Sequence, residues 1–367
     1  MKGHARPSDK IVVVAVFSIG LISILAWACT PQGRSARVPK PRFEGEPVYI
    51  DVHNHLFAKF PSQGQTVTDY EGAVQNALTQ MNELGVRKAI IMPHPFTYNQ
   101  RDTYVFEDFL SALKPYPDRF GFLGGGGTLN VMLMEAARDG RTSPELRAVF
   151  EKRAREILAK GALGFGEMAT EHVSFRKDHP YESAPTDHPL LLLLADIAAE
   201  AGVPLDLHME AVPQDMPLPA GLDSPPNPKT LRANIQAFER LLAHNRRAKI
   251  IWSHVGWCNT GSRTVELCRR LLAEHPNLYM SFKIRPDSLP QNRPLNKDGQ
   301  IKPEWVRLVA DFPDRFMLGA DQFFMPLQLA KQRPRPVEAV YAFVSQLPES
   351  LKAKVGYENA RQVFKIK

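Results

Sequence analysis

Histidines and acidic residues that can bind a metal stand at or near the ends of several short apolar runs. They are His53, His55, Glu167, His208, His254 and Asp321. In a strand, alternate side chains point to one face, so His53 and His55 can direct both imidazoles to one place. Imidazoles together with a carboxylate suit a borderline divalent ion such as zinc. One histidine at a strand end usually serves packing, but several such ends with acidic partners indicate a shared metal site.

The runs that position these residues alternate with helical patterns, as in repeated strand–helix–strand units. Eight strands are predicted, at residues 48–55, 88–93, 120–125, 163–168, 203–209, 249–255, 278–284 and 315–321. Helices are predicted at residues 70–84, 145–160, 189–201, 230–242, 264–274, 303–311 and 337–347. This order predicts an α/β fold, a (β/α)₈ TIM barrel, in which functional side chains gather at the carboxyl ends of the strands.

An open doubly wound sheet is the structural alternative. Its nucleotide-binding form requires G-x-G-x-x-G after the first strand, and residues 51–55 read D-V-H-N-H there instead. Four glycines at 124–127 follow the third predicted strand, and we interpret them as a flexible loop near the barrel mouth. The pattern therefore favours the barrel.

The first residues of the chain predict export. A basic start over residues 1–10 precedes an uncharged run of 19 residues, 11–29, which ends in Ala26-Trp27-Ala28-Cys29. A charged start, an apolar stretch and a small-residue ending are typical of a signal peptide. Residues 25–29 also resemble a bacterial lipoprotein box, although Ala26 stands where leucine is usual.

We therefore expect residues 1–28 to be a lipoprotein signal and the protein to be a periplasmic or cell-envelope lipoprotein attached to the membrane at Cys29. Cleaved soluble export is one alternative. An uncleaved membrane anchor is another, because the apolar run is long enough to span a bilayer. Residues 29–47 are predicted to be a linker, and residues 48–367 form the barrel domain.

Composition and charge narrow the class of protein. Hydrophobic residues make up 44% of the chain and charged residues 23%, which excludes disordered, collagen-like and coiled-coil classes. The net charge is +7, but the basic residues are dispersed, so we expect a small-molecule substrate and no nucleic acid. Three cysteines cannot build a disulfide framework. Cys258 and Cys268 can either bridge or stay free, and a homo-oligomer is left open.

Six segments, in this order, resemble the amidohydrolase superfamily. They are YIDVHNH, GFGEM, PLDLHME, IIWSHVGW, RFMLGADQF and YENARQVF. They are most similar to the branch that includes the aminocarboxymuconate-semialdehyde decarboxylase and related hydrolases. The resemblance covers residues 48–367, and its motifs are specific for the superfamily but not for a substrate.

The resemblance implies a role for each matching residue. The metal ligands it implies are His53, His55, His208 and Asp321. Asp321 would also shuttle a proton from bound water, and His254 would handle a proton or stabilise an oxyanion. Glu167 stands where two-metal relatives have a bridging ligand, often a modified lysine. One ion per chain is therefore the default expectation and two the alternative, with zinc preferred over manganese.

This site predicts an exported metal-dependent hydrolase, in which a metal-activated water attacks an ester, lactone or amide carbonyl. Neutral His254 would add a path for the proton. The first alternative is a metal-dependent decarboxylase, a lyase that uses the same side chains. The second is a barrel that has lost catalysis and binds a ligand at the cell envelope.

Other side chains near the predicted mouth are candidates for contact with substrate: His94, Trp257, Lys283 and Arg285. The two basic residues could bind a substrate carboxylate through charge-assisted hydrogen bonds, and Trp257 could line an apolar pocket. Their alternatives are loop packing for His94, solvated charges for the basic pair and core packing for Trp257. The histidines after the fourth strand are interpreted as structural: His172, His179 and His188.

Overall fold

The computed structural model describes residues 48–62, 65–97, 104–175, 177, 179–330 and 338–366. The predicted signal segment at residues 1–28 and the linker at 29–47 lie outside these residues. The fold of the described part is α/β, with a central sheet whose principal strands are parallel.

The principal strands pair in an order that returns to its start. Along the sheet the order is β5 (Phe120–Phe122), β4 (Val86–Ile91), β1 (Tyr49–Leu56), β14 (Phe316–Leu318), β13 (Leu278–Phe282), β12 (Lys249–Val255), β9 (Pro204–Met209), β7 (Phe165–His172) and β6 (Gly124–Gly125). Only Leu123 separates β5 from β6, so the two ends of this order meet. Such a ring of parallel pairings is consistent with the predicted TIM barrel.

Short strands add to the ring or pair beside it. β15 (Gln322–Phe324) pairs with β1, and β8 (Glu182–Ser183) pairs with β7. Two hairpins lie apart from the main sheet, formed by β2 (Lys59–Ser62) with β3 (Gln65–Thr68) and by β10 (Met216–Pro217) with β11 (Thr230–Leu231).

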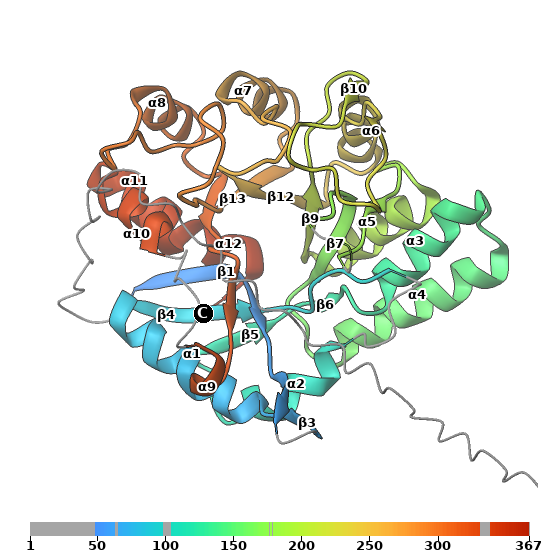
Figure 1. Cartoon of the computed structure of the whole chain (residues 1–367), viewed down its shortest axis with the longest axis horizontal. Coiled ribbons are helices and arrows are strands. Elements are labelled where there is room, and N and C mark those ends of the chain that lie inside the picture. Colours follow the sequence, from blue (N-terminus) through green and yellow to red (C-terminus); the bar gives the residue numbers. More distant parts are fainter. Residues whose placement is uncertain are drawn as a thin grey trace, which may run out of the picture. The chain divides into compact units, whose positions relative to one another are not determined.

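Helices cover the outside of the strands (Figure 1). They are α1 (Tyr70–Leu84), α2 (Phe106–Leu113), α3 (Leu129–Asp139), α4 (Pro144–Ala159), α5 (Pro189–Ala201), α6 (Ile235–His244), α7 (Val265–Glu274), α8 (Pro303–Asp311), α9 (Leu327–Ala330), α10 (Glu338–Ser345), α11 (Glu349–Ala353), the π-helical turn η1 (Lys354–Glu358) and α12 (Asn359–Phe364). None of the described helices is both long and apolar enough to cross a membrane.

Helix ends follow the local sequence. The Asp69 carboxylate accepts a hydrogen bond from the Gly72 amide at 2.7 Å, which satisfies a free donor at the start of α1. Gly85 ends that helix with φ of 72°, a left-handed conformation that costs glycine little. Both signals are visible in the sequence, and α1 begins and ends where the pattern predicts.

Several predicted boundaries are wrong. The strand expected at 163–168 is Phe165–His172, the strand expected at 88–93 is Val86–Ile91, and the strand expected at 120–125 is divided at Leu123. Residues 230–242 were expected to be one helix, but Thr230–Leu231 forms β11 and the helix begins at Ile235. The last strand was expected to run to Asp321, but β14 ends at Leu318. Asp321 has a φ of 54°, which is incompatible with an extended strand.

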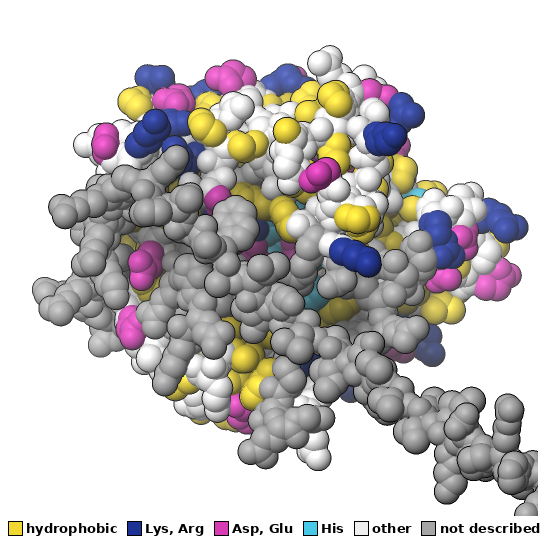
Figure 2. All heavy atoms as spheres, in the orientation of Figure 1, with side chains coloured by type: hydrophobic (Ala, Val, Ile, Leu, Met, Phe, Trp, Pro, Cys, Tyr) yellow, Lys and Arg dark blue, Asp and Glu magenta, His cyan; other side chains and the backbone are white. Residues whose placement is uncertain are grey.

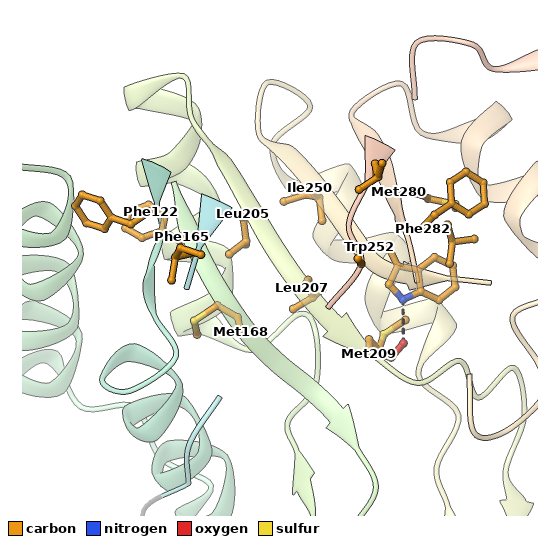
Figure 3. Packing of buried hydrophobic residues seen from close by; sticks show 14 of the residues in the cluster. Phe122, Phe165, Met168, Leu205, Leu207, Met209, Ile250, Trp252, Met280 and Phe282 are labelled. Carbon is orange, nitrogen blue, oxygen red and sulfur yellow. Dashed lines mark hydrogen bonds between the residues drawn. The ribbon is translucent and has the colours of Figure 1, made fainter. Parts of the chain in front are cut away.

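A large apolar cluster fills the space between the strands and the helices. Figure 3 shows part of it, with side chains from neighbouring strands packed in one layer. Trp252 is fully buried there, and its indole nitrogen donates a hydrogen bond to the Met209 carbonyl at 2.9 Å. Cys258 and Cys268 both belong to this cluster and are buried. Both thiols are free, so these two cysteines do not form a bridge.

A second, smaller cluster lies inside the ring. It contains Val52 of β1, Ile251 of β12 and Met317 of β14, together with Val363 and Phe364 of α12. β12 pairs with neither β1 nor β14, so side chains from these strands can meet only in the interior. The last helix therefore packs its apolar face against the inner core.

Candidate metal and active site

The metal-capable side chains predicted from the sequence converge at the carboxyl ends of the strands. His53 and His55 lie in β1, Glu167 in β7, His208 in β9 and His254 in β12, and Asp321 follows β14. The four histidines and Glu167 are at most 5% exposed. Figure 2 shows histidine side chains in a recess near the centre of the face in view.

The strand that carries the H-x-H pair changes its pairing along its length. The register of β1 with β4 shifts between Asp51 and Asn54. Val52 faces the inner core cluster, whereas His53 and His55 face the acidic side chains of the site. An irregularity of this kind re-aims the side chains that follow it. Before the shift the strand therefore contributes an apolar side chain to the inner core, and after it the strand directs two imidazoles into the site.

Glu167 lies at the centre of the site and divides its two oxygens between two pairs of histidines. Oε2 is 3.5 Å from His53 Nε2 and 3.4 Å from His55 Nε2. Oε1 is 2.9 Å from His208 Nδ1 and 3.0 Å from His254 Nε2. Burial favours the neutral acid, but His53, His208 and His254 hold the pKa of Glu167 well below its ordinary value. The carboxylate is therefore ionised.

The remaining ring nitrogens of the H-x-H pair are held by neighbouring groups. His53 Nδ1 is 3.1 Å from an oxygen of Asp206, and His55 Nδ1 is 2.9 Å from the Met92 carbonyl oxygen. The Nε2 atoms of both rings are buried and point at the carboxylates of the site, with no well-aligned hydrogen bond to any described residue. Metal-binding histidines usually have one nitrogen held in this way and the other directed at the ion. The pair fits a metal.

The potential ligand atoms fall into two groups that share Glu167. One group is His53, His55 and Glu167, and the other is Glu167, His208 and His254, with ligand atoms within 4.8 Å of one another in each. The resemblance implies that His208 binds with the H-x-H pair, whereas in the structure it belongs with His254. His254 thus lies where it could bind a metal as well as handle a proton.

Asp321 joins the first group and holds a buried cation. Its Oδ1 lies 3.1 Å from His55 Nε2, and its Oδ2 lies 2.5 Å from Lys283 Nζ. Burial opposes ionisation, yet Lys283 and His55 hold the pKa of Asp321 well below its usual range. Lys283 is only 6% exposed, and its ammonium lies 3.8 Å from the centre of the Trp257 ring. The predicted alternative of a solvated loop charge is therefore wrong for Lys283.

Two residues of the site have a backbone conformation that is rare without glycine. His254 has a φ of 71° and Asp321 a φ of 54°. A non-glycine residue in this region costs of order 1–3 kcal/mol and persists where the surroundings impose it. Strain of this kind clusters at functional sites, and these two are the residues for which the family resemblance implies a role in proton transfer.

Aromatic and imidazole rings form the wall of the recess beside the H-x-H pair. The Phe323 ring centre is 4.5 Å from that of His55. His94 stacks on Phe96 at 4.2 Å and lies 6.2 Å from His55. Burial, and then the nearby His55, lower the pKa of His94 to about 4, so its ring is neutral. His94 is thus placed at the mouth, as the sequence predicts.

His172, which was predicted to be a structural residue, lies beside His208 in the site. The His172 ring centre lies 4.6 Å from that of His208, at the end of β7. Its Nδ1 is buried without a hydrogen-bond partner among the described residues. His188, by contrast, is structural as predicted, because its side chain accepts a hydrogen bond from the Leu190 amide at the start of α5.

One predicted residue, Arg285, lies apart from the site, and one residue that was not predicted, Asp206, belongs to it. Arg285 pairs with Asp287 at 3.0 Å, and within the described part of the chain no hydrogen bond or ion pair joins its side chain to the other site residues. Asp206, which supports His53, was not predicted. Its signal was the D-x-H spacing with His208, since residues two apart on a strand share a face.

The fold and these side chains define a parallel α/β enzyme with a candidate metal site at the carboxyl ends of its strands. A family model described as amidohydrolase matches residues 50–366. The chain belongs to the amidohydrolase family and is an enzyme of that superfamily, as the sequence motifs indicate. A search of curated proteins returned no match.

Solved structures with similar folds include enzymes of several activities. A probable 2-pyrone-4,6-dicarboxylic acid hydrolase from Acinetobacter baumannii has 12% identity and a TM-score of 0.49, with 87% of this chain and 99% of that chain covered. Dihydroorotase from Saccharomyces cerevisiae has 14% identity and a TM-score of 0.47, with 88% and 85% covered. A 2,6-dihydroxybenzoate decarboxylase has 12% identity and a TM-score of 0.46, with 87% and 99% covered. Likeness at this level says nothing about the substrate.

Proposed function

We propose that the protein is a metal-dependent hydrolase that cleaves an ester, lactone or amide bond of a small molecule. The observation that carries this proposal is the position of Glu167, whose two oxygens each face a different pair of histidines. A buried carboxylate placed in this way fits a shared ligand between two divalent ions. Imidazole and carboxylate donors favour zinc, with manganese second.

The residues present assign the ligands. His53, His55 and Asp321 would hold one ion together with Glu167, and His208 with His254 would hold a second on the other oxygen of Glu167. When bound, such ions polarise a carbonyl group and lower the pKa of water, which makes a nucleophile available at neutral pH. Asp206 and the Met92 carbonyl fix the imidazoles of the H-x-H pair in the orientation this requires.

The chain's own groups supply the proton path and the binding surface. Asp321 is ionised and can accept a proton from the attacking water, and Lys283 holds that carboxylate in place. The Trp257 and Phe323 rings flank the recess and would exclude bulk water from it. If Asp321 turns toward a metal, the buried Lys283 ammonium is free to bind an anionic group of the substrate.

The first experiment measures metal content in three proteins: the wild type, Glu167→Gln and His244→Gln. His244 lies at the surface and pairs with Asp196, so its variant is a matched control. We expect about one to two equivalents of zinc per chain in the wild type and the control. Glu167→Gln should lose most of it. Equal metal content in all three proteins, or none in any, contradicts the proposal.

The second experiment identifies the reaction. Esters, lactones and amides are screened in water labelled with ¹⁸O, and we expect the label in the acid product of any active compound. A turnover that releases carbon dioxide without uptake of label would replace the hydrolase by the decarboxylase predicted as its alternative. Metal without turnover of either class would favour the binding protein.

We also propose, from the sequence of residues 1–29, that the enzyme is exported and attached to the membrane at Cys29. Its support is the basic start, the apolar run and the small residues before that cysteine. Fractionation of cells that express the wild type and Cys29→Ser tests it. We expect the wild type in the membrane fraction and the variant uncleaved; equal mass and distribution would contradict lipidation.

A further inference from the structure

A cavity of about 510 Å³ lies at the amino-terminal ends of the strands, away from the histidine site. It is lined by residues at or just before the starts of β1, β4, β5 and β7 and by residues of η1 and of the α12 region. The residues that matter for its chemistry are Val48, Ile50, Arg87, Lys88, Phe120 and Arg361. Ile50 also belongs to the inner core cluster, so part of this core separates the cavity from the candidate metal site.

The cavity combines an apolar wall with a cationic rim. Arg87, Lys88 and Arg361 face it, and Asp118 is the single acidic residue among the described side chains that line it. Lys88 is fixed by hydrogen bonds from its ammonium to the carbonyls of Pro117 at 2.7 Å and Phe120 at 3.4 Å. Carbonyl partners carry no net charge, so the nearby Asp118 is the one acidic group of the described lining that offsets the charges of Lys88 and the two arginines.

Neither arginine of the rim is engaged by the described part of the chain. Arg87 and Arg361 are exposed, and their side chains have no hydrogen bond or ion pair with any described residue. Five of the ten other exposed arginines in the described part of the chain have carboxylate partners, such as Arg155 with Glu200 at 3.1 Å, whereas neither arginine of this rim has one. Two unpaired guanidinium groups beside one apolar cavity are therefore complementary to an anion that carries an apolar body.

We propose that this cavity binds a small amphipathic carboxylate, with an aromatic or medium-chain aliphatic body, at a second site that takes no part in the hydrolytic chemistry. Guanidinium groups bind carboxylates with two parallel hydrogen bonds. The apolar wall gains roughly 25 cal/mol for each Å² of apolar surface removed from water. The cavity volume falls within the range of small-molecule sites, about 300–1,000 Å³.

The probe for this site is 2-naphthoate, titrated into the full chain by calorimetry, with neutral 2-naphthamide and acetate as comparisons. We expect 2-naphthoate to bind at one equivalent and the other two to bind at least about tenfold more weakly, because one lacks the charge and the other the apolar body. Equal affinity for the neutral amide overturns the proposal, since the cationic rim would then contribute nothing.

Two sets of variants locate the site. Arg87→Gln/Arg361→Gln removes the rim charges, and we expect affinity for 2-naphthoate to fall at least about tenfold. Arg141→Gln/Arg307→Gln removes two exposed charges elsewhere and should leave affinity unchanged. An equal loss in both variants, or a loss in neither, overturns the proposal. These substitutions lie at the surface, so a failure to fold is not expected.

Three further variants test the place of binding and the other possible occupants. Val48 is 40% exposed, and Val48→Trp should fill the cavity and abolish binding, whereas His208→Ala should not alter it. Binding lost only in His208→Ala would place the probe at the metal site and overturn the proposal.

Glu44→Gln/Glu46→Gln neutralises the acidic residues that precede Val48 in the sequence. A large gain of probe affinity there would show that the chain itself competes for the cavity, and would also overturn it.

Discussion

At the scale of single residues, the site depends on groups that hold one another in place. Asp206 illustrates this: one of its oxygens lies 3.1 Å from His53 Nδ1, and it also accepts a hydrogen bond from the Ser253 hydroxyl at 2.7 Å. Both interactions fix the carboxylate, which fixes the imidazole in turn. Groups of this kind are nearly as important to a metal site as the ligands themselves.

We therefore expect Asp206→Asn to weaken metal binding about 10–100-fold without unfolding the protein. The amide is isosteric but cannot hold the imidazole with a negative charge. Competition with a chromophoric chelator measures the affinity. Asp196→Asn, at the surface beside His244 and Asn245, is the matched control. An unchanged affinity in Asp206→Asn would show that His53 does not depend on this partner.

Glu182 is a buried acid whose titration should change the free energy of unfolding with pH. Burial, and then the charge of Glu167, raise the pKa of Glu182 to about 8. The pKa of a glutamate in the unfolded chain is about 4.3. Between that pH and about 8, Glu182 is protonated in the folded state but ionised in the unfolded state, so its contribution to stability falls as the pH rises. Its side chain accepts a hydrogen bond from Asn130 at 3.1 Å, which an amide oxygen would retain.

We expect Glu182→Gln to gain stability over the wild type as the pH rises from 5 to 8, by at least about 1 kcal/mol. Urea unfolding at both values measures it. Glu135→Gln, at an exposed position of α3, should show no such gain. A stability difference between Glu182→Gln and the wild type that is the same at pH 5 and pH 8 would contradict the raised pKa, since other buried acids such as Glu171 contribute equally to both proteins.

At the scale of elements, the strands could be predicted well and some helices could not. The runs at 249–255 and 204–209 are apolar and bounded by turn signals, so both strands were evident. α2 and α3 were missed because one is short and the other follows a run of glycines. The shift in β1 pairing and the left-handed residues of the site arise from tertiary contacts, which no local pattern encodes.

The last helix offers a test of the inner core. Phe364 of α12 is 3% exposed and packs in the inner cluster. We expect Phe364→Ala to destabilise the protein by about 3–5 kcal/mol, because it removes a buried aromatic side chain and leaves a cavity. Phe175 is 50% exposed, and Phe175→Ala should cost less than about 0.5 kcal/mol. Denaturant unfolding compares the two, and equal losses would place Phe364 outside the core.

At the scale of the whole molecule, the candidate site connects strands from around the ring. Its ligands come from β1, β7, β9 and β12 and from the residues after β14. The sequence predicted this set of residues, since each follows or ends an apolar run. The contacts of the two Glu167 oxygens with different pairs of histidines could not be predicted, because they depend on the relative positions of β1, β7, β9 and β12 in the folded sheet.

Metal bound across these strands should stabilise the fold as a unit. A ligand that binds only the folded state adds about 2.7 kcal/mol at a concentration of 100 times its Kd. We expect a chelator to lower the Tm of the wild type by several degrees, and added zinc to restore it. Glu167→Gln should respond to neither. A wild-type Tm that does not change with metal would contradict the site.

The two ends of the described chain meet at one place, since Val48 and Ile366 line the same cavity. A ring of parallel pairings does not depend on which strand comes first in the chain. A short peptide could therefore join residue 366 to residue 48, and the chain could be opened instead in the exposed turn at 140–143. We expect such a circular permutant to rebuild the same ring. The order of synthesis would change, and the arrangement of the histidines would not.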